Sequence, residues 1–480
     1  MPQAADGAPF TVNTTTDAAP VANACVSVPS CSLREAIVAA NANPDADVIT
    51  VPGGTYTLTQ GTLTVTNPVT IDGAGARSTT VDGNDASRVF TINNSGTITT
   101  ITGLTVTGGN ADATAPVTAG NGGGFLTGPQ ANLVLRGTAV VGNRASLSGG
   151  GISYGHTGAT GTIESSLIAG NTAGDPASVM AANGGGIFAQ GGLTVSNSTI
   201  TDNSARTTLA AQGGGILALA MNVNLVNNTV SDNTAAGGTS MGGGIMNAAT
   251  LSATNTIVAG NTGGDCGAAA LGATLANNLS GDASCGFTGA AGTQNANPAL
   301  GPLADNGGPT NTRAIAQSSP AANAGTATGC PATDQRGVAR PQGPACDIGA
   351  FEAPYTAPGA GGGAATPPVT PPRTSAGRKP GLKVTGVPKR CRRSKFEIRL
   401  RSSVSGTGVK LRSVRVTLNG KKLRTVTKAG RFRVKIDAKK LKAGRKYTIR
   451  VRATDSKGRA TAFKKSFKRC KAKTAKRKKR

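Results

Sequence analysis

Two aspartates in equivalent positions of a repeated sequence are the first candidates for chemistry in this chain. Asp202 and Asp232 each precede an Asn, and they lie one coil apart if the repeats stack. Paired carboxylates can hydrolyse glycosides or bind calcium. Other repeats have Gly142, Gly170 or Gly260 at this position, which favours a turn that accepts Asp or Gly. The sequence therefore predicts structural aspartates, with a carboxylate pair or a calcium site as the alternative.

Other reactive residue types are few. His156 is the only histidine, and it follows Tyr154 in a Gly-containing stretch that is typical of a coil edge. There is no Cys-x-x-Cys spacing to indicate a zinc site. Aromatic residues make up 3% of the chain, too few for an extended platform on which sugars stack. We therefore predict no catalytic, cofactor-binding or metal-binding residue, and we interpret His156 as a surface or loop residue.

These residues belong to a repeat that runs from Leu104 to Cys266. An alternating apolar stretch, a Gly-Asn or Asp-Asn pair and a Gly-Gly-Gly-apolar sequence recur five or six times. The last five repeat asparagines are 28, 32, 30 and 28 residues apart, which indicates stacked supersecondary units. The asparagines are Asn110, Asn143, Asn171, Asn203, Asn233 and Asn261, and the triple glycines precede Phe125, Ile152, Ile187, Ile216 and Ile245.

The repeats have the period of strands. Leu104–Thr107 and Leu193–Val195 alternate apolar and polar residues and are bounded by Gly and Asn. A helix would lose about 1 kcal/mol at each interior glycine, whereas coils of short strands use glycine at corners with positive φ. Asn also tolerates such corners, and its amide can hydrogen-bond to the Asn of the next coil. The pattern predicts a parallel β-solenoid of roughly ten coils.

Several local sequences resemble known families. Residues 48–56, 69–75 and 103–109 resemble the opening coils of right-handed parallel β-helix proteins of the pectate-lyase-like class. Cys31-Ser-Leu-Arg-Glu-Ala-Ile37 is similar to the motif of CSLREA-domain proteins. Residues 334–352 resemble the closing segment of secreted bacterial choice-of-anchor Q domain-containing proteins. The resemblance covers residues 25–355 and implies an all-β fold, a right-handed parallel β-helix.

Both ends of such a solenoid must be covered. We expect a short helix over Leu33–Asn41, which contains Arg34 and Glu35, to cap the first coil. Four charged residues are expected to form a salt-bridged network around the other terminus. They are Asp334, Arg336, Arg340 and Asp347.

Parallel β-helices often act on acidic polysaccharides, so a polysaccharide lyase or glycoside hydrolase is the main alternative function. A lyase needs a cation for the sugar carboxylate and a base, commonly Lys or Arg. Residues 1–372 contain no Lys, and Arg136, Arg144 and Arg206 are scattered in the sequence. A non-enzymatic role is therefore favoured, with no cofactor and with calcium as the alternative.

Charge divides the chain. Residues 1–372 hold 9 Arg and 19 acidic residues (9 − 19 = −10), whereas residues 373–480 hold 41 Lys and Arg and 3 acidic residues (41 − 3 = +38), which together give the net charge of +28. A stretch rich in Gly and Pro between them indicates a linker. We expect an N-terminal segment (1–24), a β-helix (25–355), a linker (356–380), a basic β-sandwich (381–470) and a basic tail (471–480).

The basic part is patterned as strands. Val414–Leu418 alternates apolar and polar residues and is followed by the hairpin signal Asn419-Gly420. The region resembles the small Ig-like or FnIII-like sandwiches of bacterial surface proteins. Its excess of cations predicts a polyanionic partner, which is an anionic cell-wall polymer or polysaccharide, with extracellular nucleic acid as the alternative. The polyanion-binding candidates are Lys468, Arg469, Lys471, Lys473, Lys476, Arg477, Lys478, Lys479 and Arg480.

The cysteines indicate an oxidising compartment, because all eight form neighbouring pairs that respect the domain boundaries. The predicted disulfides are Cys25–Cys31, Cys266–Cys285, Cys330–Cys346 and Cys391–Cys470. Residues 1–7 have no signal-peptide pattern, so we expect a leader that was removed or a misassigned start. No apolar run is long enough for a transmembrane helix.

The combined prediction is a non-enzymatic exported protein, located outside the cell or on its surface. Its β-helix would serve as an adhesive or structural surface, and its basic domain would bind anionic envelope polymers. The alternatives are a lyase or hydrolase of acidic polysaccharides and an extracellular protein that binds DNA or matrix.

Overall fold

The computed structural model describes most of the chain. In the first 359 residues these are 7–21, 25, 30–111, 120–219, 222–248, 250–267 and 271–356. In the rest they are 381–385, 396–403, 411–418, 421–426, 430–437, 441–442, 445–455, 460–468 and 470. The chain divides into two units, residues 1–359 and 360–480, which we describe separately.

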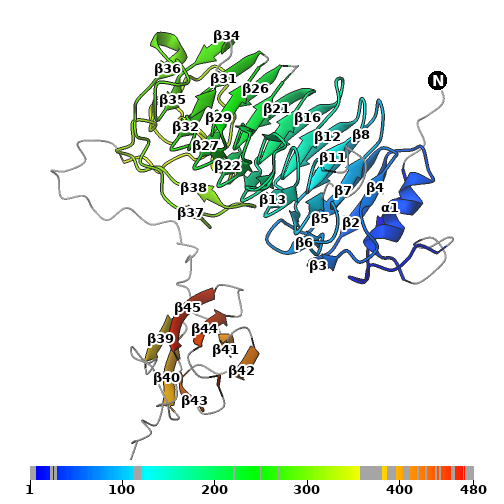
Figure 1. The fold of residues 1–480 in the computed structure, drawn as a ribbon, viewed down its shortest axis with the longest axis vertical. Coiled ribbons are helices and arrows are strands. Elements are labelled where there is room, and N and C mark those ends of the chain that lie inside the picture. The colour runs from blue at the N-terminus through cyan, green and yellow to red at the C-terminus, as the bar shows by residue number, and fades with distance from the viewer. Residues whose placement is uncertain are drawn as a thin grey trace, which may run out of the picture. The chain divides into compact units, whose positions relative to one another are not determined.

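Unit 1 is a parallel β-helix, in which successive coils add one strand each to the same sheets (Figure 1). Sheet A contains, in order, β1 (Pro9–Thr11), β2 (Asp47–Val51), β5 (Val69–Gly73), β8 (Ile98–Thr102), β12 (Asn132–Arg136), β16 (Thr160–Glu164), β21 (Gly192–Ser196), β26 (Val223–Val226), β31 (Leu251–Thr254) and β34 (Leu271–Ala276). Its ten strands agree with the predicted number of coils.

Two more long sheets complete the solenoid wall. Sheet B contains β3 (Gly54–Thr57), β6 (Thr79–Asp82), β9 (Thr105–Thr107), β13 (Ala139–Val141), β17 (Leu167–Ala169), β22 (Thr199–Thr201), β27 (Thr229–Ser231), β32 (Ile257–Ala259), β35 (Asn278–Ser280) and β36 (Gly292–Thr293). Sheet C contains β4 (Leu63–Val65), β7 (Phe90–Ile92), β11 (Phe125–Thr127), β15 (Ile152–Tyr154), β20 (Ile187–Ala189), β25 (Ile216–Ala218), β30 (Ile245–Asn247) and β33 (Cys266–Gly267).

Shorter strands form the corner between sheets B and C. Sheet D contains β10 (Asn110–Ala111), β14 (Arg144–Ala145), β18 (Thr172–Ala173), β23 (Ser204–Arg206) and β28 (Thr234–Ala236). Sheet E contains β19 (Ala182–Asn183), β24 (Ala210–Gln212) and β29 (Thr239–Met241). The all-β parallel solenoid predicted from the repeats is confirmed.

The core consists of apolar rows that run from coil to coil. In sheet A, alternate residues point inward, and equivalent inward residues pair in register with the next strand. One fully buried row contains Ile71, Ile101, Leu135, Ile163, Val195 and Leu225. Each coil therefore buries its apolar residues against its neighbours, as expected for a solenoid.

The N-terminal end is covered by α1 (Leu33–Asn41), as predicted (Figure 1). The helix begins with a capping box, in which the Ser32 side chain accepts from the backbone N–H of Glu35 and the Glu35 carboxylate accepts from that of Ser32. The Arg34 guanidinium bonds to Asp17 at 2.7 Å and to the backbone oxygen of Thr62 at 3.0 Å. These contacts join the helix to the N-terminal segment and to the first coils.

Residues 294–356, the closing segment, follow η1 (Gly289–Ala291) and run along the outer face of sheet B. They include the antiparallel strands β37 (Leu303–Ala304) and β38 (Thr312–Arg313). Leu303 packs on Leu167 and Ala169, while Phe351 and Ile348 join the cluster of Ile257 and Ala259. Arg77, near the first coils, bonds to the backbone oxygens of Gly308 and Thr310 at 3.0 Å.

The closing-segment network predicted around the C-terminal end therefore lies elsewhere, along the side of the solenoid. Asp334 pairs with Arg336 at 2.6 Å. Arg340 pairs with Glu352 at 2.8 Å, and the prediction had not included Glu352. Asp347 accepts the backbone N–H of Asn323 at 2.7 Å and forms no direct ion pair within the described part of the network.

Unit 2 contains two antiparallel sheets. One consists of β39 (Gly381–Thr385), β40 (Phe396–Ser403) and β43 (Gly430–Ile436), and the other of β42 (Lys421–Val426), β41 (Leu411–Leu418), β44 (Lys446–Asp455) and β45 (Ala460–Lys468). Apolar residues of both sheets share one core, so the sheets pack face to face. The Ig-like or FnIII-like assignment stays a prediction, and the expected linker from residue 357 onward lies outside the described residues.

Three disulfides join neighbouring cysteines in unit 1, and they are the pairs that the sequence predicts: Cys25–Cys31, Cys266–Cys285 and Cys330–Cys346. Cys470 is also disulfide-bonded. Its predicted partner, Cys391, lies outside the described residues.

Candidate functional site

The corner between sheets B and D holds the repeat asparagines. The backbone N–H and the side-chain amide of Asn143 both donate to Oδ1 of Asn171 at 3.0 Å. The same pair of bonds joins each later asparagine to the next, through Asn203 and Asn233 to Asn261. The sequence prediction that the amides of successive coils bond to one another is confirmed.

The ladder starts one residue earlier than the sequence suggested. Asn110 lies in β10, paired with Arg144, and the ladder bond to Oδ1 of Asn143 comes from the backbone N–H of Gly109. The first coil thus contributes a backbone donor where later coils contribute an asparagine. At the other end, Oδ1 of Asp265 accepts both donors of Asn261 at 3.0 and 2.9 Å.

The residue before each ladder asparagine adopts the left-handed conformation. Its φ is +58° at Asp202, +55° at Asp232, +66° at Gly142, +65° at Gly170 and +77° at Gly260. Gly and Asp are among the residues that tolerate this region best. The interpretation of Asp202 and Asp232 as turn residues is confirmed.

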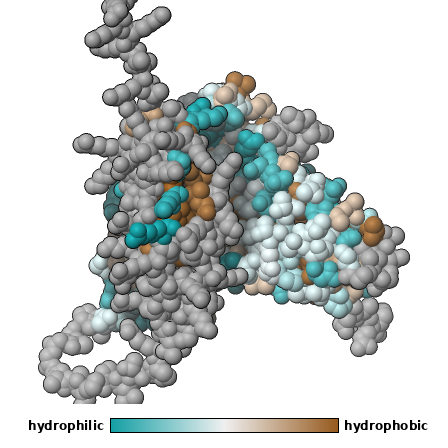
Figure 2. Space-filling view, turned by 90° about the horizontal axis from the view of Figure 1, so that it is seen from below, coloured by the Kyte–Doolittle hydropathy of each residue, from teal (hydrophilic) through white to brown (hydrophobic). Residues whose placement is uncertain are grey.

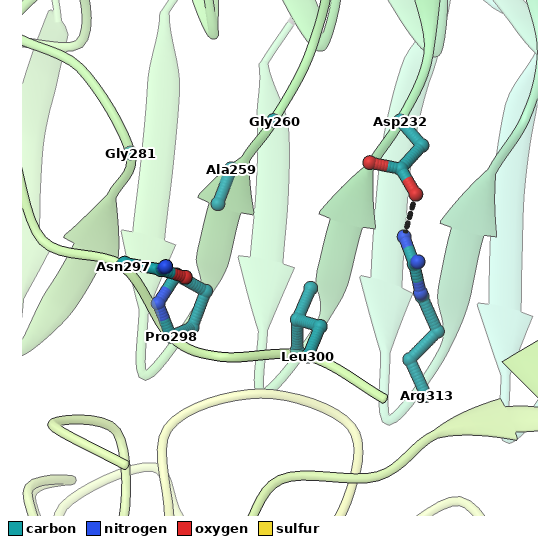
Figure 3. A pocket seen from close by; sticks show the side chains of 8 residues that line it. All are labelled: Asp232, Ala259, Gly260, Gly281, Asn297, Pro298, Leu300 and Arg313. Carbon is teal, nitrogen blue, oxygen red and sulfur yellow. Dashed lines mark hydrogen bonds and ion pairs between the residues drawn. The ribbon is translucent and has the colours of Figure 1, made fainter. Parts of the chain in front are cut away.

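Asp232 nevertheless also belongs to a pocket of about 370 Å³ between sheet B and the closing segment (Figure 3). We call it the Asp232 pocket, and it is lined by Asp232, Ala259, Gly260, Gly281, Asn297, Pro298, Leu300 and Arg313. The Arg313 guanidinium forms an ion pair with the Asp232 carboxylate and bonds to the Ser231 hydroxyl at 2.9 Å. The side chain of Asp232 is 43% exposed and that of Arg313 is 12% exposed, so the pair is open to solvent on the side of Asp232.

This pocket was not predicted from the sequence. Arg313 is 81 residues from Asp232 and belongs to a segment without repeats. The only available signal was the position of Asp232 at an exposed corner. Asp202, one coil away, does not line the pocket, so the carboxylate pair that was the alternative to turn residues is not brought together around it.

The other residues considered for chemistry are dispersed. Arg136 lies on sheet A and pairs with Glu164 at 3.0 Å, whereas Arg144 and Arg206 lie in different coils of sheet D. His156 is partly exposed in the loop after β15, in agreement with a loop residue. Tyr154 is buried in the core, where burial raises the pKa of its phenol, and it cannot stack on a ligand.

The outer face of sheet A is the second candidate site. On β2, β5, β8, β12, β16, β21, β26 and β31, the outward residues are exposed or half-exposed. One outward row in register contains Thr70, Thr100, Val134, Thr162, Thr194, Asn224 and Ser252. In Figure 2, much of the solenoid surface has the pale colour of intermediate hydropathy.

Most of the predicted polyanion-binding residues are not described. Lys468 is the last residue of β45, and Arg469 and residues 471–480 lie outside the described residues. Elsewhere in unit 2, Lys435, Lys442 and Arg445 are exposed. These cations are opposite in charge to the predicted polyanionic partner, and they do not identify it.

Within the described ranges, no group of three or more His, Cys, Asp or Glu side chains is arranged to hold a metal ion. The described part of the chain also contains no helix with the length and hydrophobicity needed to span a membrane. No protein-family model, no curated protein and no solved structure matches this chain.

Proposed function

We propose that this chain is a non-enzymatic exported protein that attaches to an anionic envelope and presents its solenoid as an adhesive or structural surface. The observation that carries the proposal is the outer face of sheet A. The closing segment packs along sheet B, whereas the outward residues of eight consecutive strands in sheet A are exposed or half-exposed. A long, regular polar face suits contact with an extended partner.

The basic unit supports the attachment. Residues 373–480 carry +38 while the preceding residues carry −10, so attraction to a polyanion is concentrated in one unit. Exposed cations on its described part include Lys435 and Lys442. An anionic wall polymer or polysaccharide is the proposed partner, and binding should weaken as salt screens the charges.

The disulfides support an extracellular or cell-surface location, because such bonds persist in oxidising compartments. We also propose membership of the CSLREA-domain and choice-of-anchor Q type. Two observations support it. The CSLREA-like sequence forms the capped helix α1, and residues 334–352 form one hydrogen-bonded unit on sheet B.

Co-sedimentation with purified cell envelopes tests the attachment. We expect the full chain to pellet at low salt and to be released as salt is added, and a chain that ends at residue 359 to stay in solution. The matched control is the full chain with residues 471–480 removed, which should bind more weakly and be released at lower salt.

Competition then identifies the polymer. Teichoic or uronic polymers should displace the full chain more efficiently than DNA at equal charge. If the shortened chain pellets as well as the full chain, the basic unit is not the anchor and the proposal fails. Superior competition by DNA would favour nucleic-acid or matrix binding instead.

A further inference from the structure

We propose that the Asp232 pocket binds one or two residues of an uncharged sugar. The site lies between sheet B and the closing segment, and its described lining residues all belong to unit 1 and not to sheet A, so the proposal does not depend on envelope attachment. Its volume of about 370 Å³ is at the lower end of the range of about 300–1,000 Å³ for small-molecule sites.

The floor of the pocket is backbone with almost no side chain. It is formed by Ala259, Gly260 and Gly281 (Figure 3). A Cβ at Gly260 would lie 2.9 Å from Oδ1 of Asp232, and one at Gly281 would lie 2.9 Å from Oδ2 of Asp265. Tight packing thus excludes a side chain at these two positions, and neither glycine adds one to the floor, so a ligand can approach the main chain directly.

Polar groups lie on two sides of this floor (Figure 3). On one side, Oδ2 of Asp232 pairs with Arg313, and Oδ1 has no hydrogen-bond partner among the described residues. On the other side, the Asn297 carbonyl accepts the N–H of Ala299 at 2.8 Å, which leaves its amide NH₂ as a donor. The pocket therefore offers both an acceptor and a donor across an open floor.

The remaining walls are apolar. Leu300, Pro298 and the methyl group of Ala259 line the space between the two polar sides. A sugar ring has C–H faces for such walls and hydroxyl groups that both donate and accept at its rim. This combination of apolar lining and a few placed polar groups is typical of small-ligand sites.

Charge selects an uncharged ligand. The charges of Asp232 and Arg313 cancel, and no further cation lines the pocket in the described structure. The free carboxylate oxygen would repel a uronate, whereas it can accept from a hydroxyl group. The inference thus differs in substrate class from the acidic-polysaccharide alternative considered for the solenoid.

Saturation-transfer NMR on the full chain tests the proposal with glucose, galactose, mannose, N-acetylglucosamine, glucuronate and galacturonate. We expect transfer to at least one neutral sugar. Uronates can also bind to the basic unit, so only the part of their signal that the pocket variants remove is compared, and that part should be smaller. The proposal is overturned if no neutral sugar receives magnetisation, or if the pocket variants remove at least as much signal from a uronate as from the best neutral sugar.

Variants locate the binding. Ala259→Leu fills the pocket from its floor, and Asn297→Asp keeps the bond to Ala299 while replacing the donor amide. Each should weaken binding about tenfold, the effect of one lost hydrogen bond or contact of about 1.4 kcal/mol.

Asp202→Asn is the matched control, because Asp202 has the same corner position one coil away and does not line the pocket. It should bind like the unmodified chain. Equal weakening in Asp202→Asn, or unchanged binding in both pocket variants, would place the sugar elsewhere. Thermal unfolding verifies that each variant folds. If Ala259→Leu does not fold, Asn297→Asp still tests the site.

Discussion

At the scale of single residues, Asp265 ends the asparagine ladder with a group that only accepts. Oδ1 accepts both donors of Asn261, and Oδ2 accepts the backbone N–H groups of Gly281 at 2.7 Å and Asp282 at 3.1 Å. Burial raises the pKa of Asp265, and the charge of nearby Asp282 raises it further. Burial and the charge of Asp282 thus disfavour the ionised carboxylate, but it accepts hydrogen bonds from four N–H donors.

Asp265→Asn should lower the free energy of unfolding by about 1–3 kcal/mol. The Asn side chain has one oxygen, which can keep the two hydrogen bonds from Asn261. Its NH₂ group then faces the backbone N–H groups of Gly281 and Asp282, which are also donors and lose their acceptor. We expect the loss of the hydrogen bonds to Oδ2 to cost more free energy than is gained by removing a buried charge. Urea unfolding at neutral pH measures the change.

The exposed aspartate Asp202 provides the control for this prediction. Asp202→Asn occupies a left-handed corner that Asn tolerates, so unfolding should stay within about 0.5 kcal/mol of the unmodified chain. If Asp265→Asn is as stable as this control, the carboxylate is not required to end the ladder.

Sequence reasoning succeeded for ladder residues because the repeat fixes their neighbours. Asn171 and Asn203 occupy equivalent positions in stacked coils, so their contact follows from the period. The prediction was wrong at Asn110, because the coil where the ladder begins uses the pair Gly108 and Gly109 at the corner. The pocket residues escaped prediction because Arg313 and Asn297 come from a segment without a period.

At the scale of elements, helix α1 was predictable and the course of the closing segment was not. Ser32 and Glu35 form a local capping signal three residues apart. The closing segment instead depends on distant contacts, such as the Gln335 amide, which donates to the backbone oxygen of Ser166 at 3.1 Å over 169 residues. No local pattern specifies contacts at such separation.

The N-terminal cap should carry a pH dependence through Asp17. Burial opposes ionisation of this carboxyl, but hydrogen bonds from Arg34 and from the N–H groups of Gln60 and Thr59 outweigh it and lower its pKa below 3.8. The stabilisation is complete above the ordinary pKa and is lost as pH falls through the lowered, folded-state value.

The difference in unfolding free energy between the unmodified chain and Asp17→Asn should therefore be constant near neutral pH and shrink below about pH 4. Urea unfolding of both proteins across an acid pH series measures this difference. The titratable groups that the two proteins share contribute equally to both and therefore do not affect the difference. Asp45→Asn serves as the control at an aspartate shortly after the same helix. A difference that persists unchanged at low pH would contradict the role of the Asp17 carboxylate.

At the scale of the whole molecule, the disulfides described in unit 1 lie at the ends of the repeats and in the closing segment. Cys25–Cys31 precedes the cap helix, Cys266–Cys285 joins β33, the last strand of sheet C, to the loop that carries buried Phe287, and Cys330–Cys346 lies within the closing segment. Solenoids are held by contacts between neighbouring coils, so their ends are where unfolding starts. The disulfides in unit 1 reinforce the ends and the segment along the side.

Replacement of both Cys266 and Cys285 by Ser should lower the free energy of unfolding by about 3 kcal/mol in the chain-entropy model for a loop of 19 residues. Hydrogen exchange should accelerate in β31, β32 and β35 and stay unchanged in α1. Replacement of Cys25 and Cys31 is the comparison, because it should accelerate exchange at the opposite end. Uniform acceleration along the solenoid would contradict this view.

Because the hydrogen bonds between successive asparagines of the ladder all run in one direction, the number of coils can change during evolution. Within the ladder, each asparagine donates to Oδ1 of its equivalent in the following coil, and its amide also donates to a backbone oxygen of the preceding coil, so every interior coil presents the same two polar faces. Only Gly109 and Asp265 are distinct. Duplication or loss of one coil in the gene would leave both ends intact and alter the length in steps of about 4.8 Å. The ladder therefore allows the length of the solenoid to be set by the number of copies of one short sequence.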